Sequence, residues 1–188
     1  MSINFPINPT RISERFVKVM RTWEICSTPR LLFHGCREND IGVDWDNCLL
    51  SGNKWFSPNE KYAGEYAWWV TRDSTSTPLC AQIKMESVQA VMRPSMHTQE
   101  WFDLIHSCFP SAPSDYELSR FIQDIMESHI CFAFGREVSA YMSCDGSEVL
   151  LPSCETFNIE VSFHQLPPIK GEYIKLFDEE GNRRQSAD

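Results

Sequence analysis

The strongest constraint on the fold is a strand–loop–strand–helix pattern in the first third of the chain. A short buried strand is predicted over 30–33, where the apolar residues run into His34-Gly35. A polar loop over 36–54 then leads to the aromatic pair Trp55-Phe56. Ser57-Pro58-Asn59-Glu60 has the sequence of a capping box with proline at the first helical position, which predicts that a helix begins there.

The rest of the chain predicts an α+β fold with a mostly antiparallel sheet, because helices and strands are segregated rather than alternating. Helical periodicity predicts helices over 11–25, 57–69, 98–108 and 114–126. Strands are predicted near 79–85, 87–92, 131–134, 137–142, 148–151, 157–163 and 172–176. Since no repeat or internal linker is visible, residues 1–179 are expected to form a single domain and 180–188 a disordered tail.

Charge and hydropathy exclude several classes of partner. The formal net charge of −9, without a cluster of Lys and Arg, argues against nucleic acid, since phosphate-binding surfaces are basic. The first residues are polar and contain proline, so no signal peptide is expected. No apolar run approaches the ~20 residues that a membrane span needs. We therefore expect a cytosolic monomer without membrane contact.

Cysteine and histidine spacing predicts free thiols and no metal. The eight cysteines show no CxxC or other clustered spacing. Some of them, such as Cys80 and Cys131, lie in apolar stretches, where a reduced cysteine behaves as a small hydrophobic residue. The histidines outside the first strand have no metal-ligand spacing: His97, His106, His129 and His164. No glycine-rich phosphate loop of the dinucleotide-binding or P-loop type is present either.

Three short segments stand in a suggestive order. They are the strand ending at His34-Gly35, the pair Trp55-Phe56 with Tyr66 ten residues after the phenylalanine, and a strand that Glu148 opens. Together they resemble the His-Tyr-Glu branch of the ADP-ribosyltransferase superfamily, which includes poly-ADP-ribose-polymerase-like catalytic domains and diphtheria-type toxins. The Glu-Val-Leu-Leu-Pro segment 148–152 is also similar to a strand of arginine-specific mono-ADP-ribosyltransferases. The resemblance implies an ADP-ribosyltransferase-like fold of two packed, mostly antiparallel sheets with flanking helices.

The resemblance also implies that the chain uses NAD as a co-substrate. Glu148 would hold the nicotinamide ribose and stabilise the oxocarbenium-like state that forms when the nicotinamide–ribose bond breaks. His34 would bond the adenosine ribose, and the backbone of Gly35 would grip the nicotinamide carboxamide. Tyr66 would stack on the nicotinamide ring, with Trp55 as the opposite wall. Purely structural roles stay open at each position, such as a core histidine, a turn glycine or an aromatic core stripe.

Five further residues are weaker candidates. Ala63 stands where polymerase-like members have a serine that bonds the carboxamide, and Ser57 could either replace that contact or cap its helix. Arg72 is a candidate for the pyrophosphate. Tyr141 and Asp145 lie in the segment before the catalytic strand, where acceptor specificity is expected, although a core role is favoured for Tyr141 as a strand residue.

The leading hypothesis is a mono-ADP-ribosyltransferase that moves ADP-ribose from NAD to a side chain of a target protein and releases nicotinamide. Small size and one domain favour a bacterial effector or toxin that acts on a protein in a host cytosol. Alternatives with the same pocket are an NAD glycohydrolase and a non-catalytic module that binds NAD or a protein. An RNA 2′-phosphotransferase would need basic phosphate-binding residues, which this acidic chain does not display.

Overall fold

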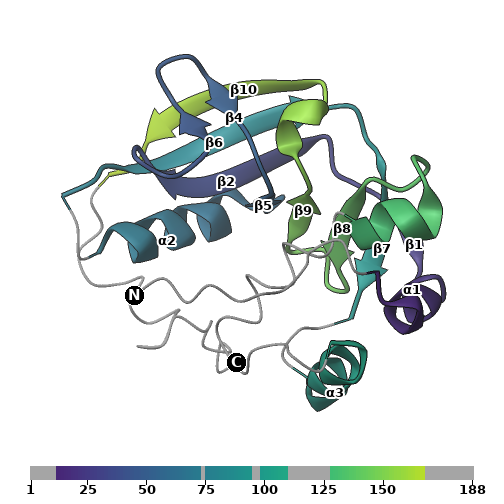
Figure 1. Cartoon of the computed structure of the whole chain (residues 1–188). Coiled ribbons are helices and arrows are strands. Elements are labelled where there is room, and N and C mark those ends of the chain that lie inside the picture. The colour runs from purple at the N-terminus through teal and green to yellow at the C-terminus, as the bar shows by residue number, and fades with distance from the viewer. Residues whose placement is uncertain (1–11, 73–74, 95–97, 110–127, 168–188) are drawn as a thin grey trace. The chain divides into compact units, whose positions relative to one another are not determined.

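The computed structural model describes residues 12–72, 75–94, 98–109 and 128–167 of the chain (Figure 1). The chain forms two compact units, each made of two stretches: residues 1–28 with 88–146, and residues 29–87 with 147–188. The fold is α+β, as predicted. The single domain over 1–179 stays a prediction. The helix predicted over 114–126, the strand over 172–176 and the tail over 180–188 lie outside the described residues.

The second unit contains a three-stranded antiparallel sheet in the order β10-β6-β2. Its strands are β2 (Leu31–Arg37), β6 (Pro78–Met85) and β10 (Ile159–Gln165). The strands predicted near 79–85 and 157–163 are confirmed. The strand predicted over 30–33 extends further, because β2 stays paired with β6 as far as Arg37. The loop predicted over 36–54 therefore begins later than expected.

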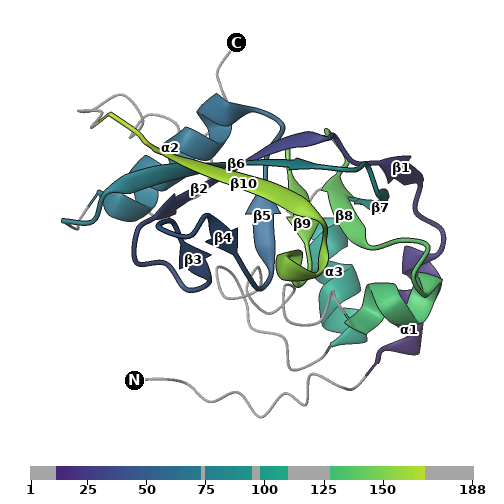
Figure 2. The ribbon, with the colours of Figure 1, turned by 90° about the horizontal axis from the view of Figure 1, so that it is seen from above.

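Helix α2 (Glu60–Thr71) packs along one face of this sheet and contacts β2 and β6 (Figures 1 and 2). Its N-cap is Asn59, whose side chain accepts hydrogen bonds from the backbone N–H groups of Lys61 and Tyr62. The predicted capping box is therefore wrong by two residues. Ser57 does not cap the helix, because its backbone exchanges two hydrogen bonds of 2.8 Å with Phe33, which keep it extended.

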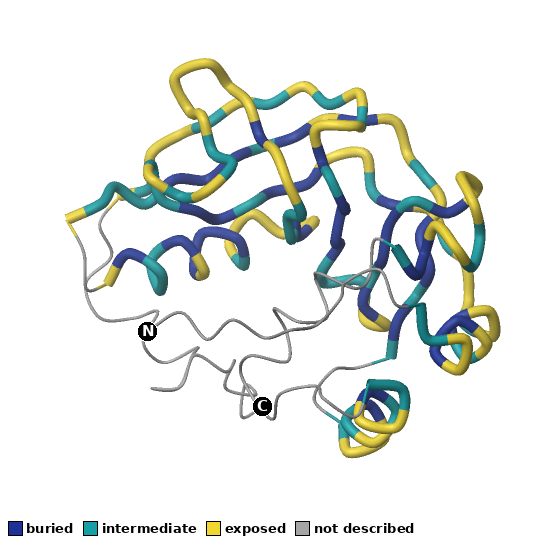
Figure 3. Tube along the Cα trace, in the orientation of Figure 1, coloured by how far each residue is buried: buried dark blue, intermediate teal, exposed yellow. Residues whose placement is uncertain are grey.

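The described part of the second unit also contains two short strand pairs. Strand β5 (Lys54–Phe56) pairs antiparallel with β9 (Val149–Leu151), so that Phe56 lies opposite Val149. Within the predicted loop, β3 (Val43–Asp44) and β4 (Leu49–Leu50) form a small hairpin, much of it exposed (Figure 3). A 3₁₀ turn, η1 (Cys154–Thr156), follows β9.

In the part of the first unit that the structure describes, β1 (Ile25–Ser27) pairs antiparallel with β7 (Gln89–Arg93), which pairs parallel with β8 (Ala140–Ser143). Its helices include α1 (Glu14–Met20), shorter than predicted, and α3 (Gln99–Cys108), which confirms the helix predicted over 98–108. None of the helices that the structure describes combines the length and apolar character needed to cross a bilayer.

One predicted strand of the first unit is wrong: residues 131–134 are helical, within a helix that is described from 128. The backbone N–H of Ser13 donates to Nε2 of the buried His129 at 2.9 Å. The same imidazole packs edge-to-face against Phe16 and Phe109. These contacts come from distant parts of the chain, so tertiary packing decides the conformation of a segment whose aromatic and cysteine residues favour a strand.

Candidate functional site

The second unit contains most of the residues that the sequence singles out. They are His34, Gly35, Trp55, Ser57, Ala63, Tyr66, Arg72 and Glu148. Because Phe56 lies opposite Val149, Glu148 is at the end of the β5–β9 pair where the chain leaves β5 through Ser57. Ser57 is bridged to Phe33, two residues before Gly35. Register and bridge together bring the start of β9, the end of β5 and the middle of β2 to one place.

The Glu148 carboxylate is oriented by a tyrosine that the sequence analysis did not select. The Tyr62 hydroxyl donates to Oε1 of Glu148 at 2.7 Å, and both side chains are half-buried. Tyr62 lies on the first turn of α2, one helical turn before Tyr66. Tyr62 could have been identified from the sequence because it lies four residues before Tyr66, and residues with that spacing share one face of a helix.

His34 is held as a neutral imidazole. Its Nδ1 lies 2.7 Å from the backbone carbonyl of Trp55, so Nδ1 carries the hydrogen and donates. Burial lowers the pKa of His34 to about 4, against smaller opposing effects such as that same hydrogen bond. The Phe56 ring lies 5.6 Å away, between ring centroids. Nε2 is therefore left as an acceptor, which suits a ligand hydroxyl.

The neutral state of His34 predicts that acid destabilises the protein. An unfolded imidazole titrates near pH ~6.5, whereas the folded pKa is about 4. Between these values the unfolded chain binds more protons, so the free energy of unfolding falls as the pH falls and the loss is complete near the folded pKa. Urea midpoints at neutral pH and near pH ~4.5 should show a smaller loss in His34→Asn than in wild type. Equal losses in the two proteins would contradict this assignment.

At Gly35 the backbones of β2 and α2 approach each other closely. A Cβ atom at this position would lie 1.8 Å from the carbonyl oxygen of Ala63 and 2.9 Å from the backbone nitrogen of Ala67. Because backbone groups two residues apart on a strand point the same way, the N–H and C=O of Gly35 face the edge where Phe33 pairs with Ser57. Only the Phe33–Ser57 bridge pairs with this edge of β2 within the part of the chain described. An adjacent N–H and C=O on one edge match the donor and acceptor of a primary amide.

Tyr66 is not a core residue, since 43% of it is exposed. Its ring lies 5.7 Å from that of Trp69, with an interplanar angle of 38°. The guanidinium of Arg72 stacks over the other ring of this pair, 4.6 Å from the Trp69 centroid, and donates to the Trp69 carbonyl. The end of α2 thus presents two aromatic rings and a cation.

A second cation near this aromatic pair is Arg37, which the sequence analysis did not name. Its Nε donates to Asp40 at 2.6 Å, and its backbone N–H donates to the same carboxylate. Hydrogen bonding and charge from Asp40 raise the pKa of Arg37, and Tyr66 adds a smaller electrostatic effect in the same direction. Arg37 is the last residue of β2, two positions after Gly35.

Three other predicted site residues are buried or half-buried in contacts between helices and strands. Ser57 and Ala63 are buried, with 2% and 4% exposed, and the Ser57 hydroxyl accepts from the backbone N–H of Asn59 at 3.1 Å. Ala63 is part of the contact between α2 and β2. Trp55 is half-buried and lies opposite Leu150. The role of Ser57 as a replacement for the carboxamide serine stays a prediction.

The two acceptor-side candidates belong to the first unit and differ from each other. Tyr141 is fully buried and its hydroxyl donates to the sulfur of Met20 at 3.7 Å, so its ring cannot be presented to a target protein and this expectation is wrong. Burial also raises the pKa of Tyr141 well above its ordinary value. Asp145 is exposed and accepts a hydrogen bond from Ser143.

Chemically, the second unit offers a carboxylate oriented by a hydroxyl, a neutral imidazole acceptor, an open backbone edge and an exposed aromatic ring. These groups can hold a ligand that combines an amide-bearing ring with sugar hydroxyls, and the carboxylate can stabilise positive charge that develops on the sugar. No family model matches this chain, and it matches neither a curated protein nor a solved structure.

Proposed function

We propose that the chain has the ADP-ribosyltransferase fold and transfers ADP-ribose from NAD to a side chain of a target protein. The observation that carries the proposal is the 2.7 Å hydrogen bond from Tyr62 to Glu148, at the strand end next to the open edge of Gly35. A glutamate that directly precedes a strand and is oriented by a neighbouring hydroxyl is suited to electrostatic catalysis, because a pre-oriented charge needs no reorganisation during the reaction.

In the proposed reaction, NAD lies with its carboxamide on the N–H and C=O of Gly35 and its nicotinamide ring on Tyr66. The acceptor Nε2 of His34 takes a hydrogen bond from a ribose hydroxyl. The bond between C1′ of the ribose and the nicotinamide nitrogen breaks, and the electron pair leaves with nicotinamide, which becomes neutral. Glu148 stabilises the positive charge that develops on the ribose. A lone pair of the acceptor then bonds to C1′, and the acceptor loses its proton to Glu148 or to water.

The acceptor is proposed to be a protein side chain, met in a host cytosol if the chain is a bacterial effector. The exposed Asp145, three residues before Glu148 in sequence, is the acidic group proposed to contact it. The acidic side chain of Asp145 favours a basic acceptor, because opposite charges attract across an interface.

The test is incubation of the purified protein with NAD labelled in its adenine ring, with and without a cell lysate, followed by gel analysis and detection of free nicotinamide. Label on lysate proteins together with nicotinamide release supports transfer. Nicotinamide and free ADP-ribose without a labelled protein would replace transfer by hydrolysis. NAD binding without either product would leave only a binding module, and no binding at all would overturn the proposal.

The hydrogen bond to Glu148 predicts that Tyr62→Phe slows nicotinamide release by about 10- to 100-fold, because a hydrogen bond to a charged group contributes about 1.5–3 kcal/mol. The ring remains, so packing of α2 should be unchanged. A matched control is Lys61→Ala at the neighbouring exposed position of the same helix. Initial rates at saturating NAD check the prediction, and equal rates for Tyr62→Phe and wild type would contradict it.

A further inference from the structure

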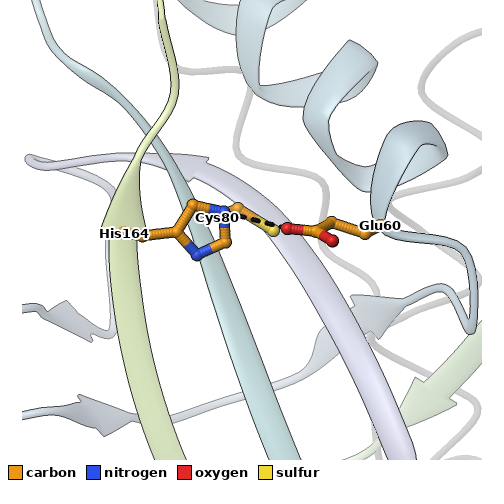
Figure 4. Close-up of side chains that lie close together, drawn as sticks. All are labelled: Glu60, Cys80 and His164. Carbon is orange, nitrogen blue, oxygen red and sulfur yellow. Dashed lines mark ion pairs between the residues drawn. The ribbon is translucent and has the colours of Figure 1, made fainter.

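Three side chains of metal-binding type converge at the start of α2, outside the contacts described above. They are Glu60, the first residue of α2, Cys80 of β6 and His164 of β10 (Figure 4). One ligand atom from each lies within 4.8 Å of the others. Oε1 of Glu60 and Nε2 of His164 are already 3.1 Å apart.

The strand register and the helix cap bring these residues together. Cys80 lies directly opposite His164 in the antiparallel β6–β10 pair, and directly opposite residues project from the same face of a sheet. That face is the one that α2 covers, since Cys80 packs in a cluster with Phe33 and Ala63. The helix begins immediately after Asn59, so Glu60 is held above the two strands.

We propose that Glu60, Cys80 and His164 bind a zinc ion, with water as the fourth ligand. Thiolate, imidazole and carboxylate are the three ligand types that zinc takes in proteins, and a thiolate disfavours magnesium and calcium. Three protein ligands with one open position is a common zinc arrangement. This proposal departs from the expectation of no metal, which rested on spacing along the chain alone.

The geometry requires only small movements. Ligand atoms of a tetrahedral zinc lie about 3.3–3.8 Å apart, given bonds of about 2.0–2.3 Å. The side chains of Glu60 and His164 are 54% and 44% exposed, so both can rotate to close the set around an ion, while Cys80 is fully buried and fixed. The exposed side of the cluster supplies the path for the ion and the water.

Binding exchanges a proton for the metal. Burial, with a smaller effect of the Glu60 charge, raises the pKa of Cys80 to about 12, so the metal-free residue is a neutral thiol. On binding, the sulfur–hydrogen bond breaks, the proton leaves to solvent, and the sulfur keeps the electron pair that it shares with zinc. The ion then links the start of α2 to β6 and β10, and so stabilises the folded chain.

The experiment uses the full chain after removal of metal with a chelator, without NAD. Co²⁺ serves as the spectroscopic probe and Zn²⁺ as its competitor. We expect one equivalent of Co²⁺ to give a thiolate charge-transfer band that Zn²⁺ abolishes, and Zn²⁺ to raise the melting temperature. Glu60→Gln and His164→Gln should each weaken Co²⁺ binding by more than about 100-fold. Loss of a residue that only orients a metal ligand weakens metal binding by up to about 100-fold, and loss of a ligand itself should cost more. Cys80→Ala should lose the band.

The other cysteines and histidines provide the controls. Cys131→Ser and His106→Gln change exposed residues outside the cluster and should leave the band and the melting shift as in wild type. Because Glu60 and His164 are half-exposed, their variants test the site even if Cys80→Ala fails to fold. Absence of the band, or a band of equal affinity in His164→Gln and wild type, overturns the proposal. Neither result depends on NAD, so the zinc site and the transferase can fail separately.

Discussion

Glu148→Gln is expected to reduce NAD cleavage by about 10²–10³-fold or more, the range observed when one pre-oriented electrostatic contact to a transition state is removed. Gln is nearly the same size and can still accept the hydrogen bond from Tyr62, so the half-buried position should remain packed. What it loses is the negative charge that stabilises the ribose as the nicotinamide leaves. Release of nicotinamide, measured at saturating NAD, gives the rate.

The same substitution on a different surface provides the control. Glu160→Gln changes an exposed glutamate of β10 in the same unit, and should leave the rate unchanged. NAD affinity, measured by quenching of tryptophan fluorescence, should fall much less than the rate in Glu148→Gln, because the charge acts mainly on the transition state. A variant that cleaves NAD as fast as wild type would remove Glu148 from the reaction.

The elements that were predicted correctly are those whose own residues show a clear apolar pattern. The strand near 79–85 and the helix over 98–108 have strong apolar patterns, and the structure places β6 and α3 there. The predicted start of α2 was wrong because Ser57 pairs with Phe33, and the capping-box pattern carries no information about that long-range contact. Residues 131–134 are helical for a similar reason, since His129 of the same helix is held by Ser13, Phe16 and Phe109 from distant segments.

For the candidate site, the sequence motifs predict which residues to consider and on which helix or strand each one lies. Glu148 was expected to open a strand and directly precedes β9, and Tyr66 is on the exposed side of α2. The contact from Tyr62 was missed because it depends on how α2 lies against β9. The strand register that places His164 opposite Cys80 could not be predicted from the sequence either, since the two residues are 84 positions apart.

Gly35→Ala is expected to destabilise the protein and to impair NAD binding. The added Cβ would lie 1.8 Å from the Ala63 carbonyl oxygen, a backbone atom that cannot move without the helix. Overpacking of a core typically costs about 1–3 kcal/mol, and a forced shift of α2 should reach the upper end of that range. Tyr62 and Tyr66 lie on the same helix, so the shift would also disturb the Glu148 contact and the stacking ring.

Gly64→Ala is the matched control, on the same helix and one residue from Ala63. Its added Cβ would meet only ordinary contacts of 3.6 Å to Leu166 and Trp68. Alanine also favours a helix over glycine by about 1 kcal/mol, so this variant should be as stable as wild type or more so. Urea unfolding and NAD titration of both variants compare the two positions. If Gly35→Ala and Gly64→Ala had the same stability and the same NAD affinity, the requirement for glycine at position 35 would be contradicted.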